Sequence, residues 1–307
     1  MSDQYHIPVM VTEVLKYLGV VNDGIYVDCT LGGGGHSQAI LSEGGSVIGF
    51  DRDRDAVAYS EKRLSKYGNL FNARVARFSG LADMVGDNAG RIKGIIMDLG
   101  VSSRMIDEPS RGFSYRLDGP LKMTMDTGGE TAFDIVNRKS IPELTDIFKQ
   151  YGQERNAARI ARAIDDARLV KPIETTLQLA DIIEKNVSSH KPQKSKARIF
   201  QALRIYINDE IGELRKGLEG AVRVLEPGGR LCVITYHSLE DREVKMFMRT
   251  KADPCICPSD LPVCSCGLSP ELRILTRKSL KPSPEEINGN SRARSAALRV
   301  SEKMGEA

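Results

Sequence analysis

The chain has 307 residues, of which 41% are hydrophobic and 28% charged, as is ordinary for a globular protein, and this composition excludes a disordered or fibrous chain. The formal net charge of +3 is too small to indicate a nucleic-acid partner by itself. No apolar run approaches the roughly 18 residues of a membrane-spanning helix, and the first residues lack a basic region followed by an apolar run. We therefore expect a cytoplasmic protein.

The first third of the chain alternates apolar, strand-like runs with helical patterns, which is the rhythm of βαβ units. The expected helices span residues 37–42 and 53–66. The fourth strand, at 92–99, is an almost continuous apolar run, which suits a strand buried on both faces. The expected strands here are 25–29, 46–50, 71–78 and 92–99.

After Gly100 the pattern changes. Residues 109–129 are rich in Gly, Pro and charge, and residues 132–188 read as helices only. Apolar residues at three- and four-residue steps over 199–225 predict one long amphipathic helix. It leads to a Pro-Gly-Gly turn at 227–229 and to the last expected strands, at 231–236, 272–276 and 297–300. We expect a discontinuous α/β domain at 1–106 and 210–307, interrupted by a helical, substrate-side domain at 107–209.

The most informative stretch runs from Asp28 to His36, where a strand leads into the four glycines 32–35 and then into a helix. Such a loop lets a cofactor approach main-chain N–H groups at the carboxyl end of a parallel sheet. The next strand ends at Asp51, where an acid can accept hydrogen bonds from a ribose diol. The pattern therefore predicts a nucleoside-containing cofactor.

Two cofactors fit this description, S-adenosylmethionine and a nicotinamide dinucleotide. The dinucleotide pattern needs a third glycine where this chain has Ser37 or Gln38. Asp28 suits a ligand with an amine and a sulfonium cation better than one with a pyrophosphate, and the Pro-Gly-Gly turn is typical of methyltransferases. These details favour S-adenosylmethionine, while an oxidoreductase and an inert RNA-binding module remain alternatives.

Ten motifs are spread along nearly the whole chain. They are His-Ile-Pro-Val-Met (6–10), Gly-Gly-Gly-Gly-His (32–36), Phe-Asp-Arg-Asp (50–53), Asp-Leu-Gly-Val-Ser-Ser (98–103), Arg-Gly-Phe-Ser (111–114), Asp-Gly-Pro-Leu (118–121), Tyr-Gly-Gln-Glu-Arg (151–155), Phe-Gln-Ala-Leu-Arg-Ile (200–205), His-Ser-Leu-Glu-Asp-Arg (237–242) and Asn-Ser-Arg-Ala-Arg-Ser (290–295). Through these motifs the chain resembles the bacterial ribosomal RNA small-subunit methyltransferase H (MraW) family. The resemblance implies a Rossmann-like class I methyltransferase sheet with helices on both faces and an inserted all-helical domain.

The resemblance also implies the activity, which is N4-methylation of a decoding-centre cytosine in 16S ribosomal RNA with S-adenosyl-L-methionine as donor. The implied partner is small-subunit ribosomal RNA or the assembled small subunit, with no membrane and no obligate protein partner in evidence. The implied cofactor-binding residues are Gly34, Gly35, His36, Asp51, Phe78, Asp98 and Met105.

The chain departs from the family pattern at three of its residues. Met105 stands where relatives carry a Gln, and it can supply only packing or a weak sulfur contact. Lys122 and Thr124 stand where relatives usually carry an acid and an arginine. These departures concern the contacts on the substrate side, and a divergent paralogue with another RNA target is the alternative.

Methyl transfer to an amine benefits from a hydrogen-bond acceptor that takes up the amine's proton. Asp98, Ser102 and Ser103 follow the fourth strand, and His237 follows the fifth, so all four are candidates for this role. His237 can equally be the cap of the next helix, and Asp98 can equally be a ligand of the cofactor alone. The sequence identifies the neighbourhood without identifying one catalytic base.

Two groups of basic residues could bind phosphate. One group is near 191–198 and the other is near the last strand, and a solvated linker is an equal alternative for the first. The residues are Lys191, Lys194, Lys196 and Arg198 in the first group and Arg292, Arg294 and Arg299 in the second.

Four of the six cysteines cluster as two C-x-C pairs separated by six residues, namely Cys255, Cys257, Cys264 and Cys266. Four thiolates can hold zinc in a tetrahedron. The familiar spacing is C-x-x-C, however, and a loop of reduced thiols is the alternative, so no metal is assigned from the sequence.

Overall fold

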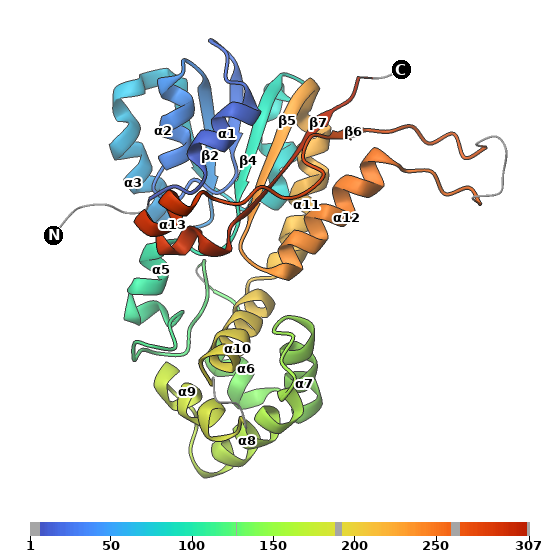
Figure 1. The fold of residues 1–307 in the computed structure, drawn as a ribbon. Helices are drawn as coiled ribbons and strands as arrows, with labels where there is room; N and C mark the ends of the chain where they lie inside the picture. Colours follow the sequence, from blue (N-terminus) through green and yellow to red (C-terminus); the bar gives the residue numbers. More distant parts are fainter. Residues whose placement is uncertain (1–6, 127, 188–191, 259–264, 306–307) are drawn as a thin grey trace. The chain divides into compact units, whose positions relative to one another are not determined.

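The computed structural model describes residues 7–126, 128–187, 192–258 and 265–305 (Figure 1). The chain forms two compact units. The sheet unit comprises 1–100 and 211–307, and the helical unit comprises 101–210. Within the described residues, no helix is both long enough and apolar enough to cross a membrane.

The sheet unit contains a seven-stranded sheet with the order β3-β2-β1-β4-β5-β7-β6 (Figure 1). The first five strands are parallel, and β7 pairs antiparallel with both β5 and β6. The order starts at β1 and winds in both directions, so the β1 and β4 ends form a switch point where such sheets bind ligands. The strands are β1 Ile25–Asp28, β2 Ser46–Asp51, β3 Phe71–Val75, β4 Ile92–Asp98, β5 Leu225–Thr235, β6 Leu272–Ile274 and β7 Ala297–Lys303.

Consecutive residues of a strand point to opposite sides of the sheet. Both faces of this sheet carry apolar side chains, and helices cover both. In β4, Ile95 packs into a cluster with apolar residues of α11, while Ile96 packs into a second cluster with α1 and α2. The predicted α/β fold class is thereby confirmed. The helices of this unit are α1 Val11–Leu18, α2 Gly35–Ser42, α3 Arg54–Leu64, α4 Leu81–Met84, α11 Glu210–Val224, α12 Ser238–Ala252 and α13 Pro284–Gly289.

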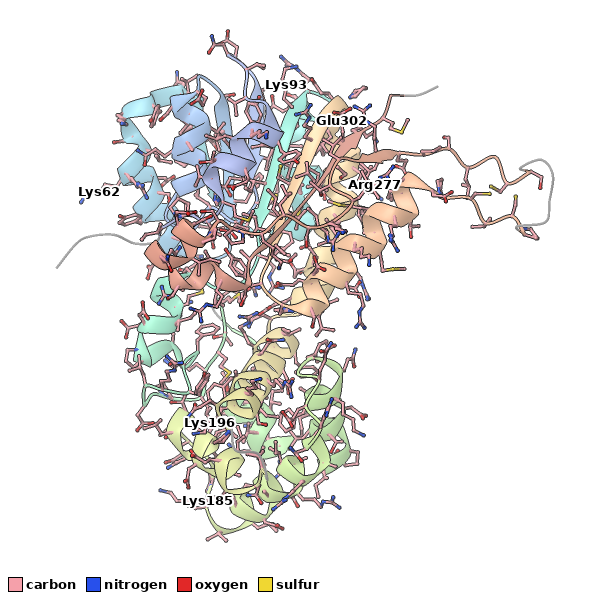
Figure 2. All side chains as sticks on the ribbon, in the orientation of Figure 1. Lys62, Lys93, Lys185, Lys196, Arg277 and Glu302 are labelled. Atoms are coloured by element: carbon pink, nitrogen blue, oxygen red, sulfur yellow. The ribbon has the colours of Figure 1, made fainter. Side chains whose placement is uncertain are left out.

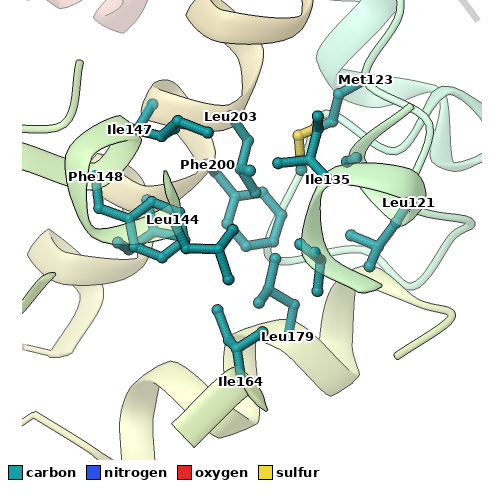
Figure 3. Close-up of a cluster of buried hydrophobic side chains, with 14 of the residues drawn as sticks. Leu121, Met123, Ile135, Leu144, Ile147, Phe148, Ile164, Leu179, Phe200 and Leu203 are labelled. Carbon is teal, nitrogen blue, oxygen red and sulfur yellow. The ribbon is translucent and has the colours of Figure 1, made fainter. Parts of the chain in front are cut away.

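The helical unit has its own hydrophobic core, in which Phe148, Ile164 and Leu203 are fully buried (Figure 3). Three of its helices begin at a capping box, in which a Thr or Ser and the residue three positions later satisfy each other's backbone N–H groups. Its helices are α5 Ser103–Asp107, α6 Ala132–Arg138, α7 Ile141–Gln150, α8 Ala157–Val170, α9 Thr176–Lys185 and α10 Pro192–Ile207.

The single long helix expected over 199–225 is wrong, because α10 and α11 are separate helices. Asp209 between them has a left-handed φ of +46°. The Asn208 side chain accepts a hydrogen bond from the Met125 backbone N–H at 2.9 Å and donates one to the Met123 carbonyl at 2.9 Å. These bonds fix the chain at the break, whereas the apolar spacing continues across it and conceals it from sequence analysis.

Candidate cofactor site

The glycine loop between β1 and α2 has a shape that side chains would not allow. Gly32 and Gly34 have left-handed φ values of +49° and +71°. A Cβ at Gly35 would lie 2.7 Å from Pro8, and one at Gly34 would lie 3.0 Å from the Ser60 hydroxyl. The loop therefore presents bare backbone at the carboxyl end of β1, as the sequence predicts.

Helix α3 holds this loop in place from one side. The Ser60 hydroxyl donates to the Gly32 carbonyl at 2.8 Å, and the Arg63 guanidinium donates to the Gly33 carbonyl at 2.6 Å. Neither residue was predicted from the sequence to belong to the site. Their signal is a polar pair three positions apart on the helix that follows the acidic strand end, so one face of α3 turns toward the loop.

Asp51 joins the end of β2 to the same loop. Its carboxylate accepts the Gly32 N–H at 2.8 Å and the Asp53 N–H at 2.9 Å. Burial raises the pKa of Asp51 to about 6, although these two bonds oppose the shift. Each carboxylate oxygen has lone pairs for two hydrogen bonds, so both oxygens retain capacity for a diol.

Asp28 does not present its carboxylate to a ligand in the way the sequence suggests. The residue is only 1% exposed, and it accepts hydrogen bonds from the Ser37 hydroxyl at 2.7 Å and the Thr30 N–H at 3.2 Å. Burial also raises its pKa. Asp28 therefore supports the loop and the first turn of α2 from inside the protein.

His36, in the first turn of α2, lies close to Asp98 at the end of β4. The His36 Nε2 donates to the Val9 carbonyl at 2.9 Å, and its Nδ1 lies 4.0 Å from Asp98 Oδ2. The Tyr236 hydroxyl donates to Asp98 Oδ1 at 2.8 Å. Burial and the neighbouring Asp98 charge raise the pKa of Tyr236 well above its ordinary value, so its hydroxyl keeps the proton that it donates.

Tyr236 was not predicted as a site residue, although its position in the sequence carries a signal. Tyr236 directly follows β5, the neighbour of β4, and the carboxyl ends of parallel strands meet at one edge of a sheet. Thr30 was not predicted either, although its hydroxyl accepts the Asp98 backbone N–H at 2.7 Å.

Phe78 lies in a short 3-10 turn after β3, and α11 limits where its ring can be. A Cβ at Gly217 would lie 2.4 Å from the Phe78 ring. The glycine therefore lets the ring pack directly on the helix backbone.

His237 acts as the N-cap of α12. Its Nδ1 accepts the Glu240 N–H at 3.4 Å, and its Nε2 lies 3.1 Å from the Glu240 carboxylate. The capping interpretation of His237 is therefore confirmed, and these contacts do not test its role as a base.

Other predicted site residues belong to the helical unit. The Ser102 hydroxyl accepts the Met105 N–H at 3.3 Å at the start of α5, and Met105 is 6% exposed within the hydrophobic core of that unit. Lys122 is exposed and Thr124 is half-buried, and the side chain of Ser103 lies outside the described residues.

The structure corrects part of the predicted phosphate-binding group near the last strand. Arg299 is 8% exposed, and its guanidinium donates to both oxygens of Asp241, at 2.8 and 2.9 Å. It is committed to this ion pair. Arg292 and Arg294 are exposed in the turn before β7.

In the other basic group, Lys196 is 7% exposed and pairs with Glu184 inside the helical unit (Figure 2). The phosphate role expected for Lys196 is therefore wrong. Lys194 and Arg198 are exposed, and Lys191 lies outside the described residues.

Three cysteines of the clustered array come together. The Sγ atoms of Cys255, Cys257 and Cys266 all lie within 4.8 Å of one another. Cys264 lies outside the described residues.

A family model described as the MraW methylase family matches residues 3–304. Similar curated proteins are called "Ribosomal RNA small subunit methyltransferase H". The protein of Carboxydothermus hydrogenoformans is 47% identical, over 97% of this chain and 98% of its own length. The protein of Halothermothrix orenii is 47% identical over 97% of this chain and 98% of its own length. The protein of Clostridioides difficile is 44% identical over 98% of this chain and 99% of its own length. The chain therefore belongs to the MraW methylase family, and it is an S-adenosylmethionine-dependent methyltransferase.

Proposed function

We propose that this chain methylates the exocyclic N4 of a decoding-centre cytosine in 16S ribosomal RNA. The observation that carries the proposal is 47% identity over 97% of the chain to a relative named as a small-subunit ribosomal RNA methyltransferase. The glycine loop, Asp51 and Asp98 support it, because they lie at one edge of the sheet and carry groups that can bind S-adenosylmethionine.

The residues at this edge fit S-adenosylmethionine. Cβ atoms at Gly34 and Gly35 would clash with Ser60 and Pro8, so glycine is needed for this tight turn. The main-chain N–H groups of such a turn, at the start of α2, are what a cofactor approaches. The Asp51 carboxylate can accept both ribose hydroxyls, and the Phe78 ring offers an apolar surface. We further propose, from the family resemblance alone, that Met105 contacts the cofactor. The cofactor supplies the methyl group, and the protein holds the reacting groups in position.

The remaining chemistry is proton removal from a weakly basic amine. The N4 lone pair of cytosine is delocalised into the ring, so an acceptor beside the amine increases its reactivity. Asp98 is suited to this because Tyr236 orients one carboxylate oxygen at 2.8 Å. Holding the amine in line with the transferred methyl can lower the barrier by several kcal/mol.

The test is mass-spectrometric mapping of small-subunit RNA from cells with and without this protein. We expect one N4-methylcytosine to disappear and to return when the purified protein and isotope-labelled S-adenosylmethionine are added to those subunits. Label on another atom, or no transfer to RNA or subunits, would contradict the proposal. Calorimetry with S-adenosylhomocysteine and with NAD separates the methyltransferase from an oxidoreductase.

Gly217→Ala should weaken S-adenosylhomocysteine binding by about tenfold. The added Cβ would lie only 2.4 Å from the Phe78 ring and would force the ring to move. Gly220→Ala is the matched control. It lies on the same helix, and its Cβ would have an ordinary 3.4 Å contact with Leu81. Calorimetry measures both variants, and equal affinities would argue against Phe78 as a cofactor contact.

Neutralising Arg292 and Arg294 together should reduce the salt dependence of RNA binding. Each lost phosphate contact lowers the slope of log K against log salt by about 0.7 for single-stranded RNA. Lys93→Ala is the control, since Lys93 lies near the amino end of β4 and pairs with Glu226 (Figure 2). An unchanged slope in the double variant would mean that Arg292 and Arg294 do not contact RNA phosphates.

A further inference from the structure

The segment that joins α12 to β6 contains two irregular arms, at 253–258 and 265–271, which run away from the sheet (Figure 1). Their described residues form neither helix nor strand. Ile256 is 79% exposed and Leu268 is 49% exposed, so the arms bury little apolar surface. The base of the segment is closed by Lys251, whose carbonyl accepts the Glu271 N–H at 2.8 Å.

Beyond this base, the two arms bring three cysteine sulfurs together. Cys255 and Cys257 come from the first arm and Cys266 from the second, and their Sγ atoms all lie within 4.8 Å of one another. The Cys255 and Cys266 sulfurs are 4.0 Å apart. Around a tetrahedral zinc ion with Zn–S bonds of about 2.3 Å, two sulfurs are about 3.8 Å apart. The one pair at 4.0 Å is close to this value, and the limit of 4.8 Å lets all three sulfurs converge on one ion.

The backbone around one thiol also suits a thiolate. The Ser265 N–H points at Cys257 Sγ from the opposite arm, at 3.4 Å, and the Ser265 hydroxyl is 3.8 Å from the same sulfur. N–H donors of this kind stabilise the charge of a thiolate and orient it toward a metal. A disulfide would join only two sulfurs and gives no reason for the third.

We propose that Cys255, Cys257 and Cys266 bind one soft divalent metal ion, zinc, which ties the two arms together. Three thiolates fill three of the four positions of a tetrahedral ion. The ion replaces the hydrophobic core that the arms lack. It acts on the structure of this segment and has no part in methyl transfer.

The experiment is elemental analysis of the purified chain, prepared under reducing conditions without chelators. We expect one zinc per chain, and little or none in the Cys255→Ser and Cys266→Ser variants. Cys232→Ala is the control, because that thiol is fully buried in β5, and it should retain the zinc. Cobalt(II) substitution should give the intense thiolate-to-cobalt absorption of a site with three or more sulfurs.

A chain that binds no zinc after incubation with excess zinc and dialysis would overturn the proposal. Equal zinc content in the serine variants would overturn it too, as would a mass two hydrogens lower that marks a disulfide under the same conditions. Binding of S-adenosylhomocysteine should be unchanged in the variants. This separates a failure of the metal site from a failure of the cofactor site.

Discussion

Replacing Asp51 by alanine should weaken S-adenosylhomocysteine binding by about 100-fold. The proposed ribose bonds end on a charged acceptor, and hydrogen bonds to charged groups contribute about 1.5 to 3 kcal/mol each. The variant also removes the acceptor for the Gly32 N–H, which the carboxylate holds at 2.8 Å, so the loop loses one of its anchors. Calorimetry gives the affinity directly.

Asp55→Asn is the matched control for this change. Asp55 lies four residues further on, in the exposed first turn of α3, and the substitution removes the same charge. Its affinity for S-adenosylhomocysteine should stay within a factor of two or so of the original. If Asp51→Ala binds as well as this control, the ribose does not lie against Asp51.

The pKa of Asp51 predicts how binding depends on pH. Burial raises this pKa from 3.8 to about 6. At a pH between these two values, the carboxyl is mostly protonated in the folded chain and mostly ionised in the unfolded chain. Between these values the carboxyl's contribution to stability falls as pH rises. Cofactor affinity should change in the opposite direction, because the carboxylate is the better acceptor, and it should drop as pH falls below about 6. Calorimetry of Asp51→Asn should show no such drop.

The strands of the sheet could be predicted because their information is local. Near-continuous apolar runs between turn residues mark β1, β2 and β4, and their ends at Asp28, Asp51 and Asp98 are visible in the sequence. The position of β5 was also predicted, but it begins earlier, at Leu225, because the chain already pairs with β4 before the Pro-Gly-Gly turn.

The remaining details depend on contacts between distant residues. Asp28 and Asp51 are both acids at strand ends, yet only packing decides that the first is enclosed beneath α2. Arg299 resembles a surface arginine until β7 places it beside Asp241. Likewise, the break at Asp209 depends on Asn208 reaching a loop more than eighty residues away, at Met123.

Asp98→Ala should lower the rate of methyl transfer by about 100-fold or more, which is the usual loss when a proton acceptor is removed. The alanine variant also leaves the half-buried Tyr236 hydroxyl without its carboxylate partner, now 2.8 Å away. Labelled methyl transfer to small subunits measures the rate, and calorimetry measures cofactor affinity in the same preparation.

Two further variants separate the roles that Asp98 can have. Asp98→Asn keeps an oxygen for the Tyr236 hydroxyl but loses the charge, so a loss of kcat with unchanged cofactor affinity indicates proton removal. A loss of affinity alone indicates a cofactor ligand. Tyr236→Phe removes only the group that orients the carboxylate, and we expect a rate about tenfold lower. If Asp98→Ala retains both cofactor binding and turnover, the site does not lie at the end of β4.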